Sequence, residues 1–189
     1  HGAMENYAAI KERLIARAAL AVIGVDDEHS RAIARRRVGP VVQVSLEAVT
    51  PPGMLARGML LEWIESDRRI IADPGRIRSG PGRHNAQNAA AAAAVALALG
   101  LSDEAIQSGI RSFPGLPHRM EEVGRRGATL FINDSKATNA DSTEKALASF
   151  DNILWILGGS DKEGQLTDMR SYIRKFTKAY LIGATTEDF

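Results

Sequence analysis

The sequence has no cysteine among its 189 residues, and aromatic side chains make up only 5% of them. The lack of cysteine excludes disulfides and thiolate metal sites and fits a reducing compartment, so we expect a cytoplasmic protein. No apolar run approaches the ~20 residues that cross a membrane. The formal net charge is +1, which gives no strong field for nucleic acid or an anionic lipid surface. We therefore expect neither nucleic acid nor a membrane as a partner.

The rest of the composition is ordinary for a soluble globular protein, with 44% hydrophobic and 25% charged residues. The length suits one large domain or two small ones with cores of their own. Three consecutive arginines at 35–37 are interpreted as the solvated end of a helix rather than as a nucleic-acid patch.

The first part of the chain carries alternating helical and strand-like patterns. Met4, Tyr7, Lys11 and Leu14 share one stripe of a predicted helix. A buried strand, LAVIGVDD, follows and ends in two acids, and RAIARRR predicts a short helix. Further strands are predicted in VVQVSL, GMLLEWI and RRIIADP, which are separated by turns such as TPPG.

Beyond Gly80 the pattern favours helices. A Gly/Pro turn precedes a long alanine-rich helix closed by Gly100, and Ser102 is the predicted N-cap of a second helix. The segment PGLPHR at 114–119 cannot continue that helix and is interpreted as a linker between domains, 1–114 and 115–189.

The second domain is predicted to contain a hairpin and alternating helices and strands. The hairpin turns at 125–127, a helix covers 141–149, and another lies near 167–177. Strands are predicted in ILWILGG and AYLIG. This alternation favours an α/β fold with a parallel, doubly wound sheet. The chain stops just after a strand, which is typical of a fragment.

Two loops at predicted strand ends carry the residues most suited to chemistry. NDSKATN follows LFI, and GGSDK follows ILWIL. Ligands of doubly wound sheets bind beyond the carboxyl ends of strands. If the two strands are neighbours, Lys136 and Lys162 face one cleft beside a helix N-terminus and form an anion site. Asp134 can accept from a ribose hydroxyl pair, and Thr138 can donate to an oxygen.

The same residue types also occur at turns for purely structural reasons. Asp141 or Ser142 alone could cap the helix that follows NDSKATN. Two adjacent loops of this kind nevertheless favour a functional reading over a structural one.

GRHNAQN and Lys11 are two further candidates. Asn85 and Asn88 are three residues apart at a helix start and could pair with the edge of an adenine, although Asn85 could equally be an N-cap. His84 is interpreted as a packed or capping residue. A lysine in an apolar stripe, such as Lys11, usually extends to water. If it were buried, its amine would be neutral and reactive.

These segments resemble, in their order along the chain, a known family of enzymes. GLPHRMEEV, FINDSKATNADSTEKAL and LGGSDKEG, together with MENYAAIKERL and GRHNAQNAAAA, are similar to segments of the Mur ligases. The resemblance covers nearly the whole chain, and NDSKATN is similar to the branch that adds D-glutamate. The alternatives are a sibling Mur or folylpolyglutamate-type ligase, disfavoured by that loop, and a non-catalytic nucleotide-binding module.

The resemblance implies a fragment of a three-domain enzyme. Residues 1–114 would be the back half of a P-loop-type ATPase central domain, and 115–189 an incomplete Rossmann-like C-terminal domain that binds D-glutamate. No G-x-x-x-x-G-K-[ST] phosphate loop occurs in the sequence. The fragment itself is therefore expected to be inactive and to bind ATP weakly, and PGLPHR is expected to act as a hinge.

The implied activity is an ATP- and Mg²⁺-dependent amide ligation. D-glutamate would be added to UDP-N-acetylmuramoyl-L-alanine through an acyl phosphate, in the cytoplasm, by a monomer. The product serves peptidoglycan synthesis and hence cell wall biogenesis, cell shape and cell division.

The resemblance also implies roles for individual residues. Lys11 would be carbamylated and would help to hold Mg²⁺ indirectly, while Lys136 would lie near the reacting groups. His1 does not match the metal-binding histidine of the family. The implied binding residues are Asn85 and Asn88 for adenine, Arg119 and Asp134 for the rest of the nucleotide, and Thr138 and Lys162 for the backbone carboxylate of D-glutamate.

Overall fold

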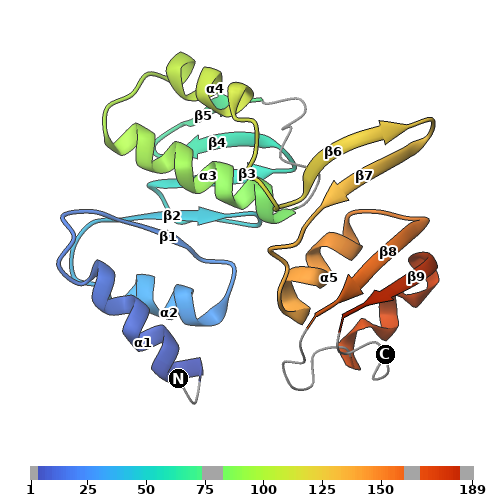
Figure 1. Ribbon diagram of the computed structural model, residues 1–189. Coiled ribbons are helices and arrows are strands. Elements are labelled where there is room, and N and C mark those ends of the chain that lie inside the picture. The colour runs from blue at the N-terminus through green and yellow to red at the C-terminus, as the bar shows by residue number, and fades with distance from the viewer. Residues whose placement is uncertain (1–3, 74–82, 160–166, 184–189) are drawn as a thin grey trace. The chain divides into compact units, whose positions relative to one another are not determined.

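The computed structural model describes residues 4–73, 83–159 and 167–183 (Figure 1). The contacts among them divide the chain into two compact units, which meet between Pro114 and Gly115. Within these ranges no helix is long and apolar enough to cross a membrane.

The first unit contains one five-stranded sheet with helices on both faces (Figure 1). Its elements are α1 (Met4–Ile15), β1 (Ala21–Gly24), α2 (Glu28–Arg36), β2 (Val41–Ser45), β3 (Gly53–Arg57), β4 (Leu60–Ile64), β5 (Arg68–Ala72), α3 (Arg83–Ala98) and α4 (Asp103–Ser112).

The sheet of this first unit is mixed. The strand order is β1-β2-β3-β4-β5; β1, β2 and β3 run parallel, whereas β3, β4 and β5 form an antiparallel meander. The sequence interpretation missed β3, because its residues run into β4 with only a two-residue turn around Gly58 between them.

Two hydrophobic clusters cover the two faces of this sheet. The larger joins β2–β5 to α3 and α4, and the smaller joins β1 to α2 with Ala8 and Ile15 at its edge. The alanine-rich sequence of α3 explains its close packing, since Ala86, Ala90 and Ala94 are at most 2% exposed. The predicted cap of α4 is confirmed: the Ser102 side chain accepts from the Ala105 N–H at 3.2 Å.

The connection between β2 and β3 is unusually short for parallel neighbours. It is possible because the two strands pair over only three positions. The Gln43 side chain holds the loop by accepting from the Thr50 N–H at 2.9 Å. A Cβ at Gly53 would lie 2.7 Å from the Cβ of Val49, so this position requires glycine.

The second unit has two separate two-stranded sheets. Its elements are β6 (Glu121–Arg126), β7 (Thr129–Asn133), α5 (Ala140–Ala148), β8 (Ile153–Gly158), the 3₁₀ helix η1 (Thr167–Lys175) and β9 (Phe176–Ile182). The predicted hairpin is present as antiparallel β6 and β7, and β8 pairs with β9 in parallel. The helix predicted near 167–177 is a 3₁₀ helix, and β9 begins three residues earlier than AYLIG.

Candidate functional site

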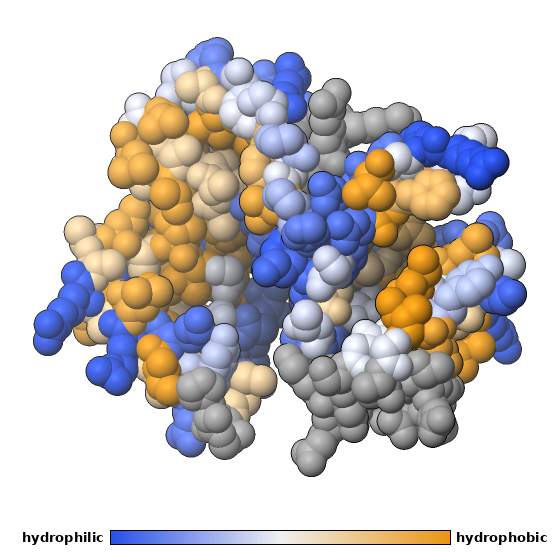
Figure 2. Space-filling model, in the orientation of Figure 1, coloured by the Kyte–Doolittle hydropathy of each residue, from blue (hydrophilic) through white to orange (hydrophobic). Residues whose placement is uncertain are grey.

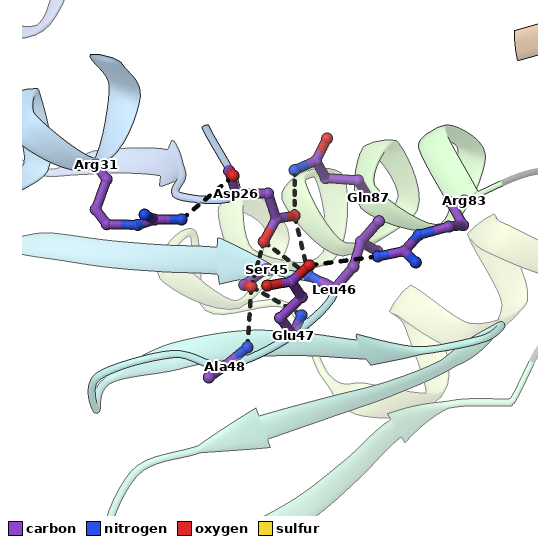
Figure 3. Close-up of polar contacts among 8 residues, drawn as sticks. All are labelled: Asp26, Arg31, Ser45, Leu46, Glu47, Ala48, Arg83 and Gln87. Atoms are coloured by element: carbon purple, nitrogen blue, oxygen red, sulfur yellow. Dashed lines mark hydrogen bonds and ion pairs between the residues drawn. The ribbon is translucent and has the colours of Figure 1, made fainter. Parts of the chain in front are cut away.

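Asp26 is the centre of a hydrogen-bond network at the carboxyl ends of β1 and β2 (Figure 3). Its half-buried carboxylate accepts from the Ser45 hydroxyl, from the Leu46 N–H at 3.0 Å and from the Gln87 side-chain amide at 2.7 Å. Arg31 donates to the Asp26 backbone oxygen instead, at 3.2 Å. Within the described ranges the carboxylate is therefore held by neutral donors.

Ser45 extends this network into the turn after β2. Its side chain is 1% exposed, and its oxygen accepts from the Glu47 and Ala48 N–H groups at 2.9 and 3.1 Å. Glu47 then pairs with Arg83, the first residue of α3, at 3.7 Å on the surface. The ends of β1 and β2 and the start of α3 thus form one connected polar cluster (Figure 3).

Asn85 and Asn88 lie in the first turns of α3, next to Gln87. Asn85 is half-buried and Asn88 is exposed. The structural alternative for Asn85 is wrong, because α3 begins at Arg83 and Asn85 is a residue inside the helix rather than its N-cap.

In the second unit the turn 118–120 is bonded to the loop after β7. The Asp134 carboxylate accepts from the Met120 N–H at 3.0 Å through Oδ1, and the Lys136 N–H donates to the His118 carbonyl at 3.1 Å. The structure therefore brings the predicted residues Arg119, Asp134 and Lys136 together. Within the described ranges, Oδ2 of Asp134 accepts no hydrogen bond and the Arg119 side chain pairs with no carboxylate.

The backbone on both sides of Arg119 is left-handed. His118 has φ 63° and Met120 has φ 49°, which non-glycine residues rarely adopt. Side chains hold the turn: Glu121 accepts from the His118 N–H at 2.8 Å, and the His118 ring nitrogen Nδ1 lies 2.9 Å from the Asn133 amide nitrogen. Strained backbone of this kind is concentrated at functional sites.

Thr138 and Asn139 complete the loop before α5. Asn139 is the N-cap, accepting from the Ser142 N–H at 2.8 Å, so the assignment of that role to Asp141 or Ser142 is wrong. Thr138 is exposed, and its N–H donates to the Lys136 carbonyl at 3.0 Å.

The chain is similar to known proteins in sequence and in fold. No family model matches it. Over its whole length it is 51% identical to a protein of Chelativorans sp. (strain BNC1) and 49% identical to one of Rhizobium johnstonii, both named UDP-N-acetylmuramoylalanine–D-glutamate ligase. The chain is a relative of these D-glutamate ligases. It spans 41% of the length of each.

Solved Mur ligase structures share the fold. A crystal structure of MurF from Acinetobacter baumannii matches 93% of this chain and 45% of its own with a TM-score of 0.60 at 18% identity. A second MurF structure from the same organism matches 84% of this chain and 35% of its own with a TM-score of 0.55 at 22% identity. At these identities the likeness concerns the mixed α/β fold alone.

One spatial expectation drawn from the predicted strand order is wrong. Strand β7 pairs with β6, whereas β8 pairs with β9, so the loops after β7 and β8 do not follow neighbouring strands of one sheet. Lys162 lies outside the described residues. The predicted convergence of Lys136 and Lys162 therefore has no support from strand pairing.

Lys11 is exposed, which contradicts the idea of a buried neutral amine. Its ammonium lies 5.3 Å from the centre of the Tyr7 ring, and Met4 and Leu14 of the same stripe are 59% and 81% exposed. The structure thus agrees with the ordinary reading, in which the lysine extends to water.

The Mg²⁺ that the ligase resemblance implies has no ready site among the described residues. In the three described ranges, no group of three or more histidine, aspartate or glutamate side chains could hold a metal ion. An unmodified Lys11 offers an amine and not the oxygen ligands that Mg²⁺ prefers. The residues present do not fit the ion, so no step proposed below passes through it.

Sequence reasoning missed several polar residues of these ligase segments. Asp26, Gln87, His118 and Asn133 were not singled out. For Asp26 a signal existed, because an acid directly after a buried strand of an α/β fold lies where ligands bind. For the left-handed His118 the local sequence carries no such signal.

Proposed function

We propose that the intact protein carrying this sequence is an ATP-dependent ligase that adds D-glutamate to UDP-N-acetylmuramoyl-L-alanine in peptidoglycan synthesis. The observation that carries the proposal is the identity of about half of all residues, along the whole chain, to ligases of that name. We further propose that the protein works in the cytoplasm as a monomer.

The reaction consists of two balanced steps. The γ-phosphoryl group of ATP passes to the L-alanyl carboxylate, which gives ADP and an acyl phosphate. The amine of D-glutamate then attacks the acyl carbon and loses a proton. A C–N bond forms, the C–O bond to phosphate breaks, and inorganic phosphate leaves.

In the first unit, the residues proposed to act are Asn85 and Asn88. Their amides offer both a donor and an acceptor, which matches the edge of an adenine. Their position on α3, beyond the carboxyl ends of parallel strands, is where nucleotides bind in α/β proteins. Lys11 is proposed to act after carbamylation, for which an exposed amine is at least accessible to CO₂.

In the second unit, Asp134 and Arg119 are proposed to bind the rest of the nucleotide. Oδ1 of Asp134 holds the backbone at Met120, which leaves Oδ2 to accept from a ribose hydroxyl. The exposed Arg119 guanidinium suits a phosphate. Lys136 is proposed near the reacting groups, and Thr138 and Lys162 on the backbone carboxylate of D-glutamate.

The amino acid that supports turnover tests the proposal. Phosphate release by the intact protein, with ATP and UDP-N-acetylmuramoyl-L-alanine, should require D-glutamate. L-glutamate, L-lysine and D-alanyl-D-alanine serve as matched controls and should give background rates. Turnover with one of these instead of D-glutamate would identify a sibling ligase, and ATP binding without turnover with any amino acid would favour a nucleotide-binding module.

A further inference from the structure

Gln87 and Asp26 form a contact between α3 and the sheet that the proposed reaction does not use. Gln87 donates from Nε2 to Oδ2 of Asp26 at 2.7 Å, across 61 residues of sequence. Both side chains are half-buried. A hydrogen bond to an ionised carboxylate is about twice as strong as one between neutral groups, so this contact is a strong link between the two elements.

The surroundings of the pair fix it in place. Oδ1 of Asp26 is occupied by the Ser45 hydroxyl, and the Leu46 N–H contacts both carboxylate oxygens at 3.2 and 3.0 Å. Gln87 also lies next to Gly24, where an added Cβ would be 3.4 Å from its Nε2, an ordinary contact distance. The carboxylate therefore has one orientation, and it presents Oδ2 to α3 (Figure 3).

Gln87 lies between the two asparagines that are proposed to read adenine. The alanines of α3 that face the sheet pack closely but make no directional contact. The hydrogen bond of Gln87 is directional and lies in the same turn as Asn85 and Asn88. It ties that turn of α3 to the loop after β1.

We propose that Asp26 and Gln87 are positioning residues that set Asn85 and Asn88 for nucleotide binding. This inference rests on the proposed function, in particular on adenine recognition by the two asparagines. Neither Asp26 nor Gln87 touches the nucleotide in this proposal, and both act through the orientation of α3.

The test exchanges the charged and neutral side chains at positions 26 and 87 in the intact protein and measures the KM for ATP and kcat. Gln87→Glu places two carboxylates in contact, and we expect the KM for ATP to rise about tenfold or more while kcat at saturating ATP stays within about threefold. Adding Asp26→Asn should restore the KM to within about threefold of the starting value, because the asparagine amide donates to Glu at 87 while its oxygen still accepts from Leu46.

Two further variants keep the test decisive. Arg83→Gln is the matched control: Arg83 lies four residues before Gln87 on α3, its ion pair with Glu47 is exposed, and the KM of this variant for ATP should not change. Gln87→Met keeps the length of the side chain without its donor. If Gln87→Glu does not fold, Gln87→Met should still raise the KM for ATP several-fold.

Three outcomes separate the possibilities. An unchanged KM for ATP in folded Gln87→Glu or Gln87→Met, or a double variant that stays as impaired as Gln87→Glu, overturns the positioning role. Asn85→Ala and Asn88→Ala report on the proposed function itself: if neither raises the KM for ATP, adenine recognition by these residues is wrong, whatever Gln87 does. A raised KM for ATP in the Asn85, Asn88 and Gln87 variants, restored when Asp26→Asn is added to Gln87→Glu, supports both the positioning role and adenine recognition.

Discussion

At the scale of single residues, His118 is the most constrained position in the second unit. It combines a left-handed backbone with three hydrogen bonds, one each through its N–H, its carbonyl and its ring. The backbone strain of about 1–3 kcal/mol is acceptable only because these contacts hold the turn beside Arg119.

The strain at His118 predicts an order among its variants. His118→Gly and His118→Ala both lose the ring contacts, but only alanine still carries the strain energy of a positive φ. We expect His118→Gly to be more stable than His118→Ala by about 1 kcal/mol in urea unfolding. Equal stability, or a more stable alanine variant, would show that residue 118 is not left-handed in solution.

Asp27 gives a prediction about pH at the scale of one helix. It caps α2 by accepting from the Ser30 N–H at 2.8 Å. Partial burial alone would raise the pKa of Asp27, but the hydrogen bonds from Ser30, together with the nearby His29 and the backbone N–H of Asp27, hold that pKa below its ordinary value. A lowered folded-state pKa means that the cap stabilises the protein at neutral pH and that this contribution is lost as the pH falls.

The change that tests this is Asp27→Ala compared with Asp27→Ser. At pH 7 the alanine variant should lose about 0.5–2 kcal/mol of stability, and serine should retain most of it. Below about pH 4 the difference in unfolding free energy between wild type and Asp27→Ala should become smaller. The difference between the serine and alanine variants should stay constant. A gap to wild type that does not depend on pH would contradict the capping role of the ionised carboxylate.

The sheet-facing side of α3 predicts sensitivity to volume. Ala90 is fully buried against the sheet, whereas Ala92, two residues further on, is exposed. Ala90→Leu should destabilise the first unit by about 1–3 kcal/mol through overpacking. Ala92→Leu adds the same atoms and should change stability by less than about 0.5 kcal/mol. Similar losses for both variants in urea unfolding would argue against this orientation of α3.

At the scale of the whole molecule, the two units differ in how much core they contain. In the first unit two clusters bury side chains on both faces of the sheet. Among the described residues of the second unit, only Met120 and Leu147 are buried. The apolar side chains Leu154, Ile156, Tyr180 and Ile182 of β8 and β9 remain 44–68% exposed, and hydrophobic residues gather over this region in Figure 2.

We therefore expect the second unit to unfold at a lower urea concentration than the first. The chain has two tryptophans, Trp63 on β4 and Trp155 on β8, so each unit carries its own fluorescent probe. The fluorescence of Trp155, measured in Trp63→Phe, should change at a lower urea concentration than the fluorescence of Trp63, measured in Trp155→Phe. Circular dichroism of both variants, compared with wild type, controls for effects of the substitutions, and coincident midpoints would show a single cooperative unit.

The sequence predicted those features that depend on neighbouring residues. The Ser102 cap, the hairpin of β6 and β7 and the alanine-rich helix follow from local spacing and propensity. The pairing of β7 with β6 instead of β8, and the bonds from Asp26 to Ser45 and Gln87, join residues distant in sequence. Hydrophobic periodicity and composition contain no information about such distant partners. The Asp26 network was therefore missed, and the prediction that β7 and β8 are neighbouring strands was wrong.

The bonds at His118 and Met120 also determine which part of the connecting segment can pivot. Asp134 and Lys136 hydrogen-bond residues 118–120 to the loop after β7, and the Leu116 carbonyl accepts from the Arg119 N–H at 3.2 Å. These bonds hold the stretch against the end of β7. Gly115, just before it, has a φ of 89°, which only glycine adopts easily, so we expect any pivoting of the connecting segment to occur there. If the segment pivots there, a substitution of Gly115 would change the position of Arg119 while leaving the Arg119 side chain itself intact.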